Sequence, residues 1–163
     1  MKRIGLLSDT HGFLHPKLEN FFKDCDEIWH AGDIGSLIVS DTIGVQKYLR
    51  AVHGNIDDHR VRIEFPAVQF FECEGLKVLM MHIGGYPGNY SPEAKEAIQK
   101  YKPGLFIAGH SHILKVIYDK KNDLLHMNPG AAGTAGIHHL ITALRFTIDD
   151  GKPTALEILE IPR

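Results

Sequence analysis

The sequence predicts an α/β sandwich in which strand–helix units come first and strands dominate the end. Short apolar runs alternate with helical patterns over residues 3–55, which is typical of parallel β-α-β units. From residue 104 onward the apolar runs are separated only by turns. Hydrophobic residues make up 44% of the 163 and charged residues 23%, which excludes a disordered chain or a coiled coil. We expect a single domain over residues 1–163.

The first 55 residues hold three expected strands, each ending in a polar turn that contains glycine. The strand runs are short and apolar, whereas the helical segments place apolar residues three or four positions apart. The expected strands cover residues 3–7, 27–30 and 50–52, and the expected helices cover residues 16–23 and 37–49.

The second half begins with an expected hairpin that turns at Glu74 and Gly75. A helix should follow, because Ser91 suits the N-cap and Pro92 the first helical position. The expected elements are hairpin arms at 67–72 and 76–81, a helix at 91–100, and strands at 104–108, 113–118, 124–127, 138–148 and 154–161.

Charge and cysteine content indicate which partners and which cellular compartment to expect. The formal net charge of −2 gives no reason to expect a broad nucleic-acid or membrane surface. Cys25 and Cys73 lie far apart and form no CxxC pattern, which favours a reduced, cytoplasmic protein without disulfides. The apolar run at the N-terminus ends at Ser8, too soon for a signal peptide or a membrane span.

Side chains that can bind metals follow five successive expected strands. Functional groups gather at the carboxyl ends of strands in open α/β sheets, so we expect these side chains to meet. The candidate ligands are Asp9, His11, Asp33, Asn55, His82, His110 and His112. Seven donors suit two ions that share a carboxylate. Mixed nitrogen and oxygen donors favour Mn, Fe, Co, Ni or Zn over Ca or Mg.

Each motif taken alone also has an ordinary structural interpretation. Asp9-Thr10-His11 is typical of a turn, and His82 alone could be a core histidine. His110 and His112 carry more information, because side chains two residues apart on an extended chain point to the same side. The occurrence of all five motifs at successive strand ends favours a functional site.

The motifs SDTHG, AGDIGS, HGNID, MHIGG and AGHSH resemble those of the calcineurin-like metallophosphoesterase superfamily. The small size and the MNPGAAG stretch look most like its compact archaeal and bacterial phosphodiesterase branch. The resemblance implies a four-layer αββα sandwich, with mixed sheets inside and helices outside. It also implies that one metal is held by Asp9, His11 and His112, the other by Asn55, His82 and His110, with Asp33 bridging them.

The resemblance implies a metal-dependent phosphodiesterase, a hydrolase with a dinuclear metal centre. A hydroxide bridging two divalent transition metals, with manganese favoured and Ni, Co, Fe or Zn as alternatives, would attack phosphorus in line with the leaving oxygen. The expected catalytic residues are Asp33, Asn55 and His82. The expected partner is a small-molecule or nucleotide phosphodiester, with neither a membrane nor a nucleic acid indicated. A homodimer is expected from the resemblance alone.

One departure from the pattern concerns the leaving group. Larger relatives place a histidine after the Gly-Asn pair, whereas this chain has Ile56, which cannot donate a proton. We therefore expect faster turnover of esters with acidic leaving groups. The serine/threonine phosphatase branch of the superfamily carries an arginine soon after the Gly-Asp motif. No arginine follows Asp33 closely in this chain, which disfavours a protein phosphatase. A phosphomonoesterase, or a non-catalytic scaffold of the same fold, remain the alternatives.

Two further features have open interpretations. The glycine-rich stretch 84–90 is either a substrate wall, with Tyr86 or Tyr90 stacking on a base, or an ordinary loop. His30 is either a partner near Asp33 or a residue packed against a helix.

Overall fold

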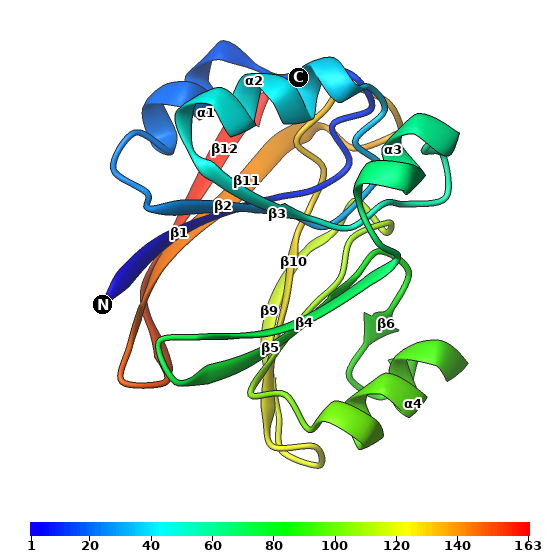
Figure 1. Cartoon of the computed structure of the whole chain (residues 1–163), viewed down its shortest axis with the longest axis vertical. Helices are drawn as coiled ribbons and strands as arrows, with labels where there is room; N and C mark the ends of the chain where they lie inside the picture. Colours follow the sequence, from blue (N-terminus) through cyan, green and yellow to red (C-terminus); the bar gives the residue numbers. More distant parts are fainter.

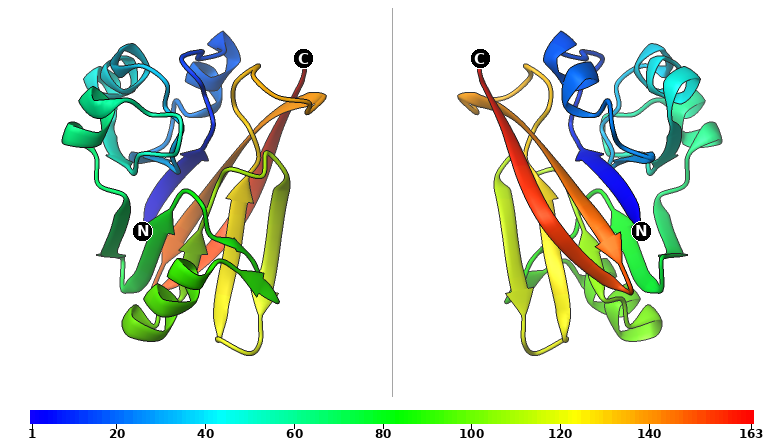
Figure 2. Two further views of the ribbon diagram at one scale, coloured as in Figure 1. Left: turned by 90° about the vertical axis from the view of Figure 1, so that its right-hand side faces the viewer. Right: turned by 90° about the vertical axis from the view of Figure 1, so that its left-hand side faces the viewer.

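Two five-stranded mixed sheets face one another in the computed structural model, which describes residues 1–163 (Figures 1 and 2). The first sheet has the order β12-β11-β1-β2-β3, in which β1, β2 and β3 are parallel and β11 and β12 antiparallel. Its strands are β1 (Lys2–Leu7), β2 (Glu27–His30), β3 (Tyr48–Ala51), β11 (Leu140–Asp149) and β12 (Lys152–Pro162).

The second sheet has the order β4-β5-β8-β10-β9. Its central strands β5, β8 and β10 are parallel, and the edge strands β4 and β9 are antiparallel to their neighbours. Its strands are β4 (Val68–Cys73), β5 (Leu76–Met81), β8 (Leu105–Ile107), β9 (Leu114–Asp119) and β10 (Leu124–Pro129). Strands β1, β2 and β3 are parallel to one another, and so are β5 and β8. The loops that follow these strands therefore leave each sheet at one edge.

The helices cover the outer faces of the two sheets. Figure 1 shows α1 (Pro16–Phe21), α2 (Leu37–Gln46) and α3 (His59–Glu64) together on one side and α4 (Pro92–Tyr101) on the other. Three apolar clusters fill the spaces between these layers: one between the sheets, one under α1–α3 and one under α4. This arrangement confirms the four-layer αββα sandwich. No helix combines the length and apolar character that crossing a membrane requires.

Trp29 on β2 is a central side chain of the cluster between the sheets. It is fully buried, and its ring meets Phe71 of the second sheet edge-on, with ring centroids 5.0 Å apart. Its Nε1 donates a hydrogen bond to Glu27 Oε2 at 3.0 Å. This bond satisfies the one polar atom of the indole ring. The Glu27 carboxylate is itself held in place, because it also accepts from Arg50 Nε at 2.9 Å.

The predicted elements are present, with bounds that shift by at most three residues, but the structure adds one helix and one small hairpin. The helix predicted for 37–49 ends at Gln46, because Lys47 turns extended and Tyr48 pairs with Glu27 of β2. The short helix α3 was not predicted, although Asp58 caps it by accepting from the backbone N–H groups of Arg60 and Val61.

The glycine-rich stretch 84–90 forms a small hairpin of β6 (Gly85–Tyr86) and β7 (Asn89–Tyr90). Tyr90 is buried there, and its hydroxyl donates to Asp119 Oδ2 at 2.8 Å. Its ring packs edge-on against Phe106. The suggestion that Tyr90 stacks on a ligand is therefore wrong, because the ring already belongs to the core under α4.

Candidate metal centre

Two clusters of potential metal ligands meet where the strand-end loops of both sheets converge. One cluster holds Asp9, His11 and His112, and the other holds Asp33, His82 and His110. Within each cluster the donor atoms all lie within 4.8 Å of one another. Donors bound to one transition metal at about 2 Å lie about 3 Å apart, so small side-chain adjustments would bring each set onto an ion.

The Asp33 carboxylate lies between the two clusters. Its Oδ2 is 3.4 Å from His11 Nε2 in one cluster and 3.2 Å from His82 Nε2 in the other. Its Oδ1 accepts a hydrogen bond from the Ile56 backbone N–H at 3.1 Å. One oxygen is thus fixed by the backbone, while the other faces histidines of both clusters.

Several polar atoms of this region are buried without a hydrogen-bond partner. They include Asp9 Oδ1, His11 Nε2 and His82 Nε2. The Asp9 oxygen is 3.1 Å from His112 Nε2, while its other oxygen accepts from Ser8 Oγ at 2.6 Å. Buried polar atoms without a partner are costly, so the convergence of these donors is typical of a ligand-binding site. A divalent cation fits the nitrogen and oxygen donor set.

The orientation of His82 is set by the backbone. Its Nδ1 lies 2.8 Å from the Ala31 carbonyl oxygen, which can only accept, so Nδ1 carries the proton and Nε2 faces the two carboxylates. Burial disfavours a charge on either His82 or Asp33 and is the largest single influence on each. For His82 it is outweighed by the combined attraction of the Asp33 and Asp9 carboxylates, and for Asp33 by that of the His82 and His11 rings together with the Ile56 N–H. The pKa of His82 is therefore raised and the pKa of Asp33 lowered.

Five of the predicted ligands adopt backbone conformations that side chains other than glycine rarely adopt. Positive φ angles of 48–69° occur at Asp9, His11, Asp33, His110 and His112. Each such residue costs about 1–3 kcal/mol, and such strain concentrates at functional sites. The argument that His110 and His112 share an extended strand and aim at one point is therefore wrong: they lie in a turn and face different clusters.

Asn55 lies beside the second cluster. It is exposed, and it lines a hollow of about 480 Å³ together with His82. The loop is held by Arg62 of α3, whose Nη2 donates to the carbonyls of Gly54 at 3.2 Å and Asn55 at 3.3 Å. The structure thus places all seven predicted ligands at the same edge of the sandwich.

Residues without a predicted role support the loops that carry the ligands. The buried Asp57 carboxylate accepts from the backbone N–H groups of Ile34, Gly35 and Gly54, so it ties the Asp33 loop to the Asn55 loop. Asn128 holds the turn with His110 and His112, since its Nδ2 donates to the Gly109 carbonyl and to Ser111 Oγ. Asp57 could have been found from sequence, because it is an acidic residue within HGNID.

His30 joins the loops of Asp9 and Asp33. Its Nδ1 accepts from the Gly32 N–H at 3.1 Å, and its Nε2 lies 3.0 Å from Thr10 Oγ1, which itself donates to the Ile34 carbonyl. Complete burial lowers the pKa of His30 to about 3, so the ring stays neutral. Its role is to position these loops.

Gly54 allows close contact with Asp33. A Cβ atom at this position would overlap the Asp33 carboxylate and lie 2.5 Å from the Asp33 backbone nitrogen. We therefore expect Gly54→Ala to weaken cation binding by at least about tenfold, comparable to the loss of a residue that supports a ligand. Titration calorimetry of Mn²⁺ into chelator-stripped protein measures this affinity.

Gly44 provides the matched control for this substitution. It lies in α2, and a Cβ there would meet nothing within 4 Å. Gly44→Ala should keep the wild-type affinity and raise helix stability by up to about 1 kcal/mol. Equal affinities for both variants would show that the close contact at Gly54 is unimportant.

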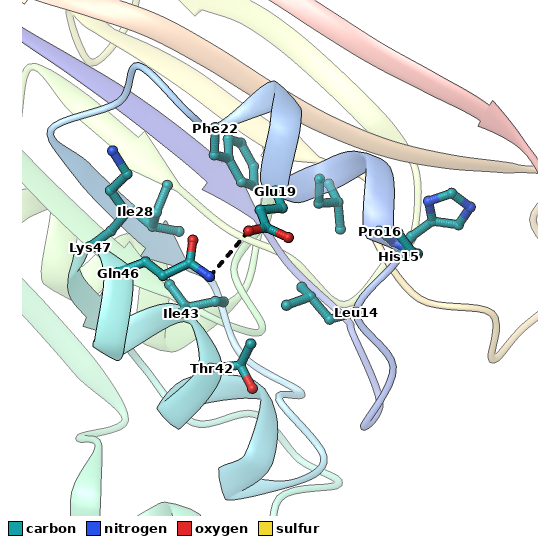
Figure 3. Close-up of a pocket in the computed structure, with 11 residues that line it drawn as sticks. Leu14, His15, Pro16, Glu19, Phe22, Ile28, Thr42, Ile43, Gln46 and Lys47 are labelled. Atoms are coloured by element: carbon teal, nitrogen blue, oxygen red, sulfur yellow. Dashed lines mark hydrogen bonds between the residues drawn. The ribbon is translucent and has the colours of Figure 1, made fainter.

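A separate hollow of about 370 Å³ lies between α1 and α2 (Figure 3). Its walls are largely apolar, and Gln46 Nε2 donates across it to Glu19 Oε1 at 3.4 Å. None of the candidate ligands lines this hollow. It lacks the converging donors of a catalytic site, so the candidate site remains at the strand ends.

The chain is similar to known proteins in both sequence and fold. A probable metallophosphoesterase of Methanothermobacter thermautotrophicus is 28% identical over 133 residues, which cover 78% of this chain and 76% of that protein. The structure of an archaeal phosphodiesterase matches with a TM-score of 0.74 at 21% identity, covering 98% of this chain and 99% of the other. A Vps29 variant from Entamoeba histolytica matches with a TM-score of 0.76 at 14% identity, covering 98% and 99%. The two structural matches show a shared fold.

The family assignment rests on the sequence match together with the donor clusters. The calcineurin-like phosphoesterase superfamily domain matches residues 1–151, which include every candidate ligand and all strands except β12. Superfamily members use divalent metals, and this chain brings together two clusters that can hold them. The chain therefore belongs to the calcineurin-like phosphoesterase superfamily.

Proposed function

We propose that this protein is a phosphodiesterase that uses two divalent transition-metal cations, with Mn²⁺ as the favoured ion. The observation that carries the proposal is the position of Asp33 Oδ2, within 3.4 Å of histidine nitrogens from both clusters. A carboxylate placed in this way can be shared by two cations. The archaeal phosphodiesterase of the same fold supports the choice of reaction.

The proposed ligands divide into two sets. Asp9, His11 and His112 would hold one cation, and Asn55, His82 and His110 the other, with Asp33 shared. When bound, two such cations lower the pKa of a water between them and neutralise the phosphate oxygens. The chain's own contribution is orientation, since the Ala31 carbonyl fixes the His82 ring and the Ile56 N–H fixes the Asp33 carboxylate.

The residue directly after Asn55 provides no proton for a leaving group. Ile56 is 45% exposed directly beside Asn55, where larger relatives carry a histidine. The aliphatic side chain cannot protonate a departing oxygen. Faster turnover of diesters with acidic leaving alcohols therefore remains our expectation.

Metal removal and reloading test the proposed function. Protein stripped with a chelator should lose hydrolysis of bis(4-nitrophenyl) phosphate and regain it with Mn²⁺, and to differing degrees with Ni²⁺, Co²⁺, Zn²⁺ or Mg²⁺. Saturation at 100 times the Kd should also raise the free energy of unfolding by about 2.7 kcal/mol for each cation bound. Absorbance of nitrophenolate and thermal denaturation measure the two effects.

Two outcomes would contradict the proposal. Preferred cleavage of 4-nitrophenyl phosphate, the monoester, would identify a phosphomonoesterase. Bound metal without turnover of either ester would favour a non-catalytic scaffold of this fold.

A further inference from the structure

The hollow beside the second cluster lies where part of a substrate would have to be placed. Asn55 and His82 line it, so a phosphate group held at the proposed metals would have a substituent directed into it. Its volume of about 480 Å³ falls within the range of small-molecule sites, about 300–1,000 Å³. It is large enough for an aromatic ring or a nucleobase.

One part of this hollow is apolar and open to solvent. Its apolar lining consists of Ala67, Val68, Met81 and Ile83. Val68 is 38% exposed and Ile83 is 45% exposed, although both lie next to the candidate centre. A ring placed against them would remove this apolar surface from water, which is favourable.

The remaining part of the hollow presents polar groups, two of which are held in place by backbone carbonyls. Arg62 uses Nε and Nη2 to donate to backbone carbonyls, including that of Asp57 at 2.7 Å, so its Nη1 remains free. His53 Nδ1 donates to the Phe65 carbonyl at 2.8 Å, which leaves Nε2 available to a ligand. Glu93 of α4 adds a carboxylate. A few fixed polar groups among apolar walls are typical of sites for ring-bearing ligands.

The loops that carry the two clusters expose apolar side chains, and Arg62 of α3 is the one cationic side chain that lines the adjoining hollow. Phe13, Ile56, Ile83 and Ile113 each follow a candidate ligand within two positions, and each is more than a third exposed. No lysine or arginine occurs in the ligand-bearing loops, residues 8–14, 31–36, 53–58, 82–90 and 109–113. Binding to a chain of phosphates requires several such cations, so a polynucleotide fits this surface poorly.

We propose that the hollow binds the ring of a singly charged phosphodiester, an aryl or nucleoside substituent, while the phosphate group lies at the metals. The inference rests on the proposed function, and it adds the substrate class. Ile83 and Val68 contact the ring face, and the polar groups of Arg62, His53 and Glu93 contact its edge.

Three diesters with the same leaving group test the role of the substituent. Each releases 4-nitrophenol, and the other ester group is methyl, phenyl or the 5′-oxygen of thymidine. Because the bond that breaks is the same, differences in kcat/KM report on the group that remains. We expect kcat/KM to be at least about tenfold higher for the phenyl and thymidine esters than for the methyl ester.

Matched variants locate the effect in the hollow. Ile83→Ser and Val68→Ser should reduce the preference for phenyl over methyl to about threefold or less, mainly through KM. Val45→Ser provides the control, because Val45 is 87% exposed on α2, away from the hollow. It should keep the full preference.

A binding measurement separates failure of this inference from failure of the proposed function. Diphenylphosphinate and dimethylphosphinate are single anions without an ester bond, so neither can be hydrolysed. Diphenylphosphinate should bind the Mn²⁺-loaded protein more tightly by calorimetry. With Mg²⁺, which is not paramagnetic, it should shift the methyl NMR signals of Ile83 and Val68.

The outcomes are distinct. Diester turnover with equal kcat/KM for all three esters would overturn the inference and leave the phosphodiesterase intact. If no diester is cleaved, the phosphinates still test whether the hollow binds a ring. Equal affinity for diphenylphosphinate and dimethylphosphinate would overturn the inference. Faster cleavage of an oligonucleotide than of the thymidine ester, with steep salt dependence, would also overturn it.

Discussion

Asp33→Asn should lower kcat for diester hydrolysis by at least about 1,000-fold, since loss of a mere supporting residue already costs about 10–100-fold at metal sites. The amide can still accept the Ile56 N–H bond through its oxygen. Its NH₂ group would replace the Oδ2 atom that faces His11 and His82, and it cannot bind a cation there. Steady-state kinetics and metal content per chain, measured on the same preparation, check this expectation.

Asp41→Asn is the control for this substitution. Asp41 is exposed on α2 and belongs to neither donor cluster, so the same loss of one negative charge should leave kcat unchanged. Circular dichroism of both variants shows whether the fold is retained. A well-folded Asp33→Asn protein with near wild-type kcat would refute the shared carboxylate.

Trp29→Ala should reduce the free energy of unfolding by about 3–5 kcal/mol, as expected for a large buried aromatic side chain. The substitution removes the ring that packs between Phe71 and Phe146 and deprives Glu27 of a hydrogen-bond donor. Single domains are stable by about 5–15 kcal/mol, so the variant should be close to unfolding. Urea denaturation followed by circular dichroism measures the loss.

Tyr48→Ala on the neighbouring strand is the comparison for Trp29. Tyr48 is 60% exposed, so its removal should cost far less. Trp29→Phe, which keeps a ring in place, should fall between the two alanine variants. A loss below about 1 kcal/mol for Trp29→Ala would show that the space between the sheets is filled by other side chains.

The strands and the positions of the ligands could be predicted because short, local stretches of sequence indicate both. An apolar run followed by Gly32-Asp33 or by Gly54-Asn55 marks a strand end without knowledge of the remaining chain. The parallel order of β1, β2 and β3 then brings these ends to one edge. The family resemblance supplied the division of the ligands between two cations, which spacing alone does not provide.

The features that could not be predicted depend on contacts distant in sequence. The helix from Leu37 ends early because Tyr48 pairs with β2, and helix α3 buries little more than Val61, so its apolar pattern is weak. The directions of His110 and His112 follow from left-handed backbone angles that the sequence does not reveal. The anchoring by Asp57 joins two loops that only the folded sheet brings together.

The division of the candidate ligands between the two sheets has a consequence for the molecule as a whole. Asp9, His11 and Asp33 follow strands of the first sheet, whereas His82, His110 and His112 follow strands of the second. A substitution far inside the core that slides one layer against the other by a fraction of an ångström would therefore spread both coordination spheres. The affinity for the proposed cations would therefore report on packing between the sheets, and a core substitution should weaken cation binding before it unfolds the protein.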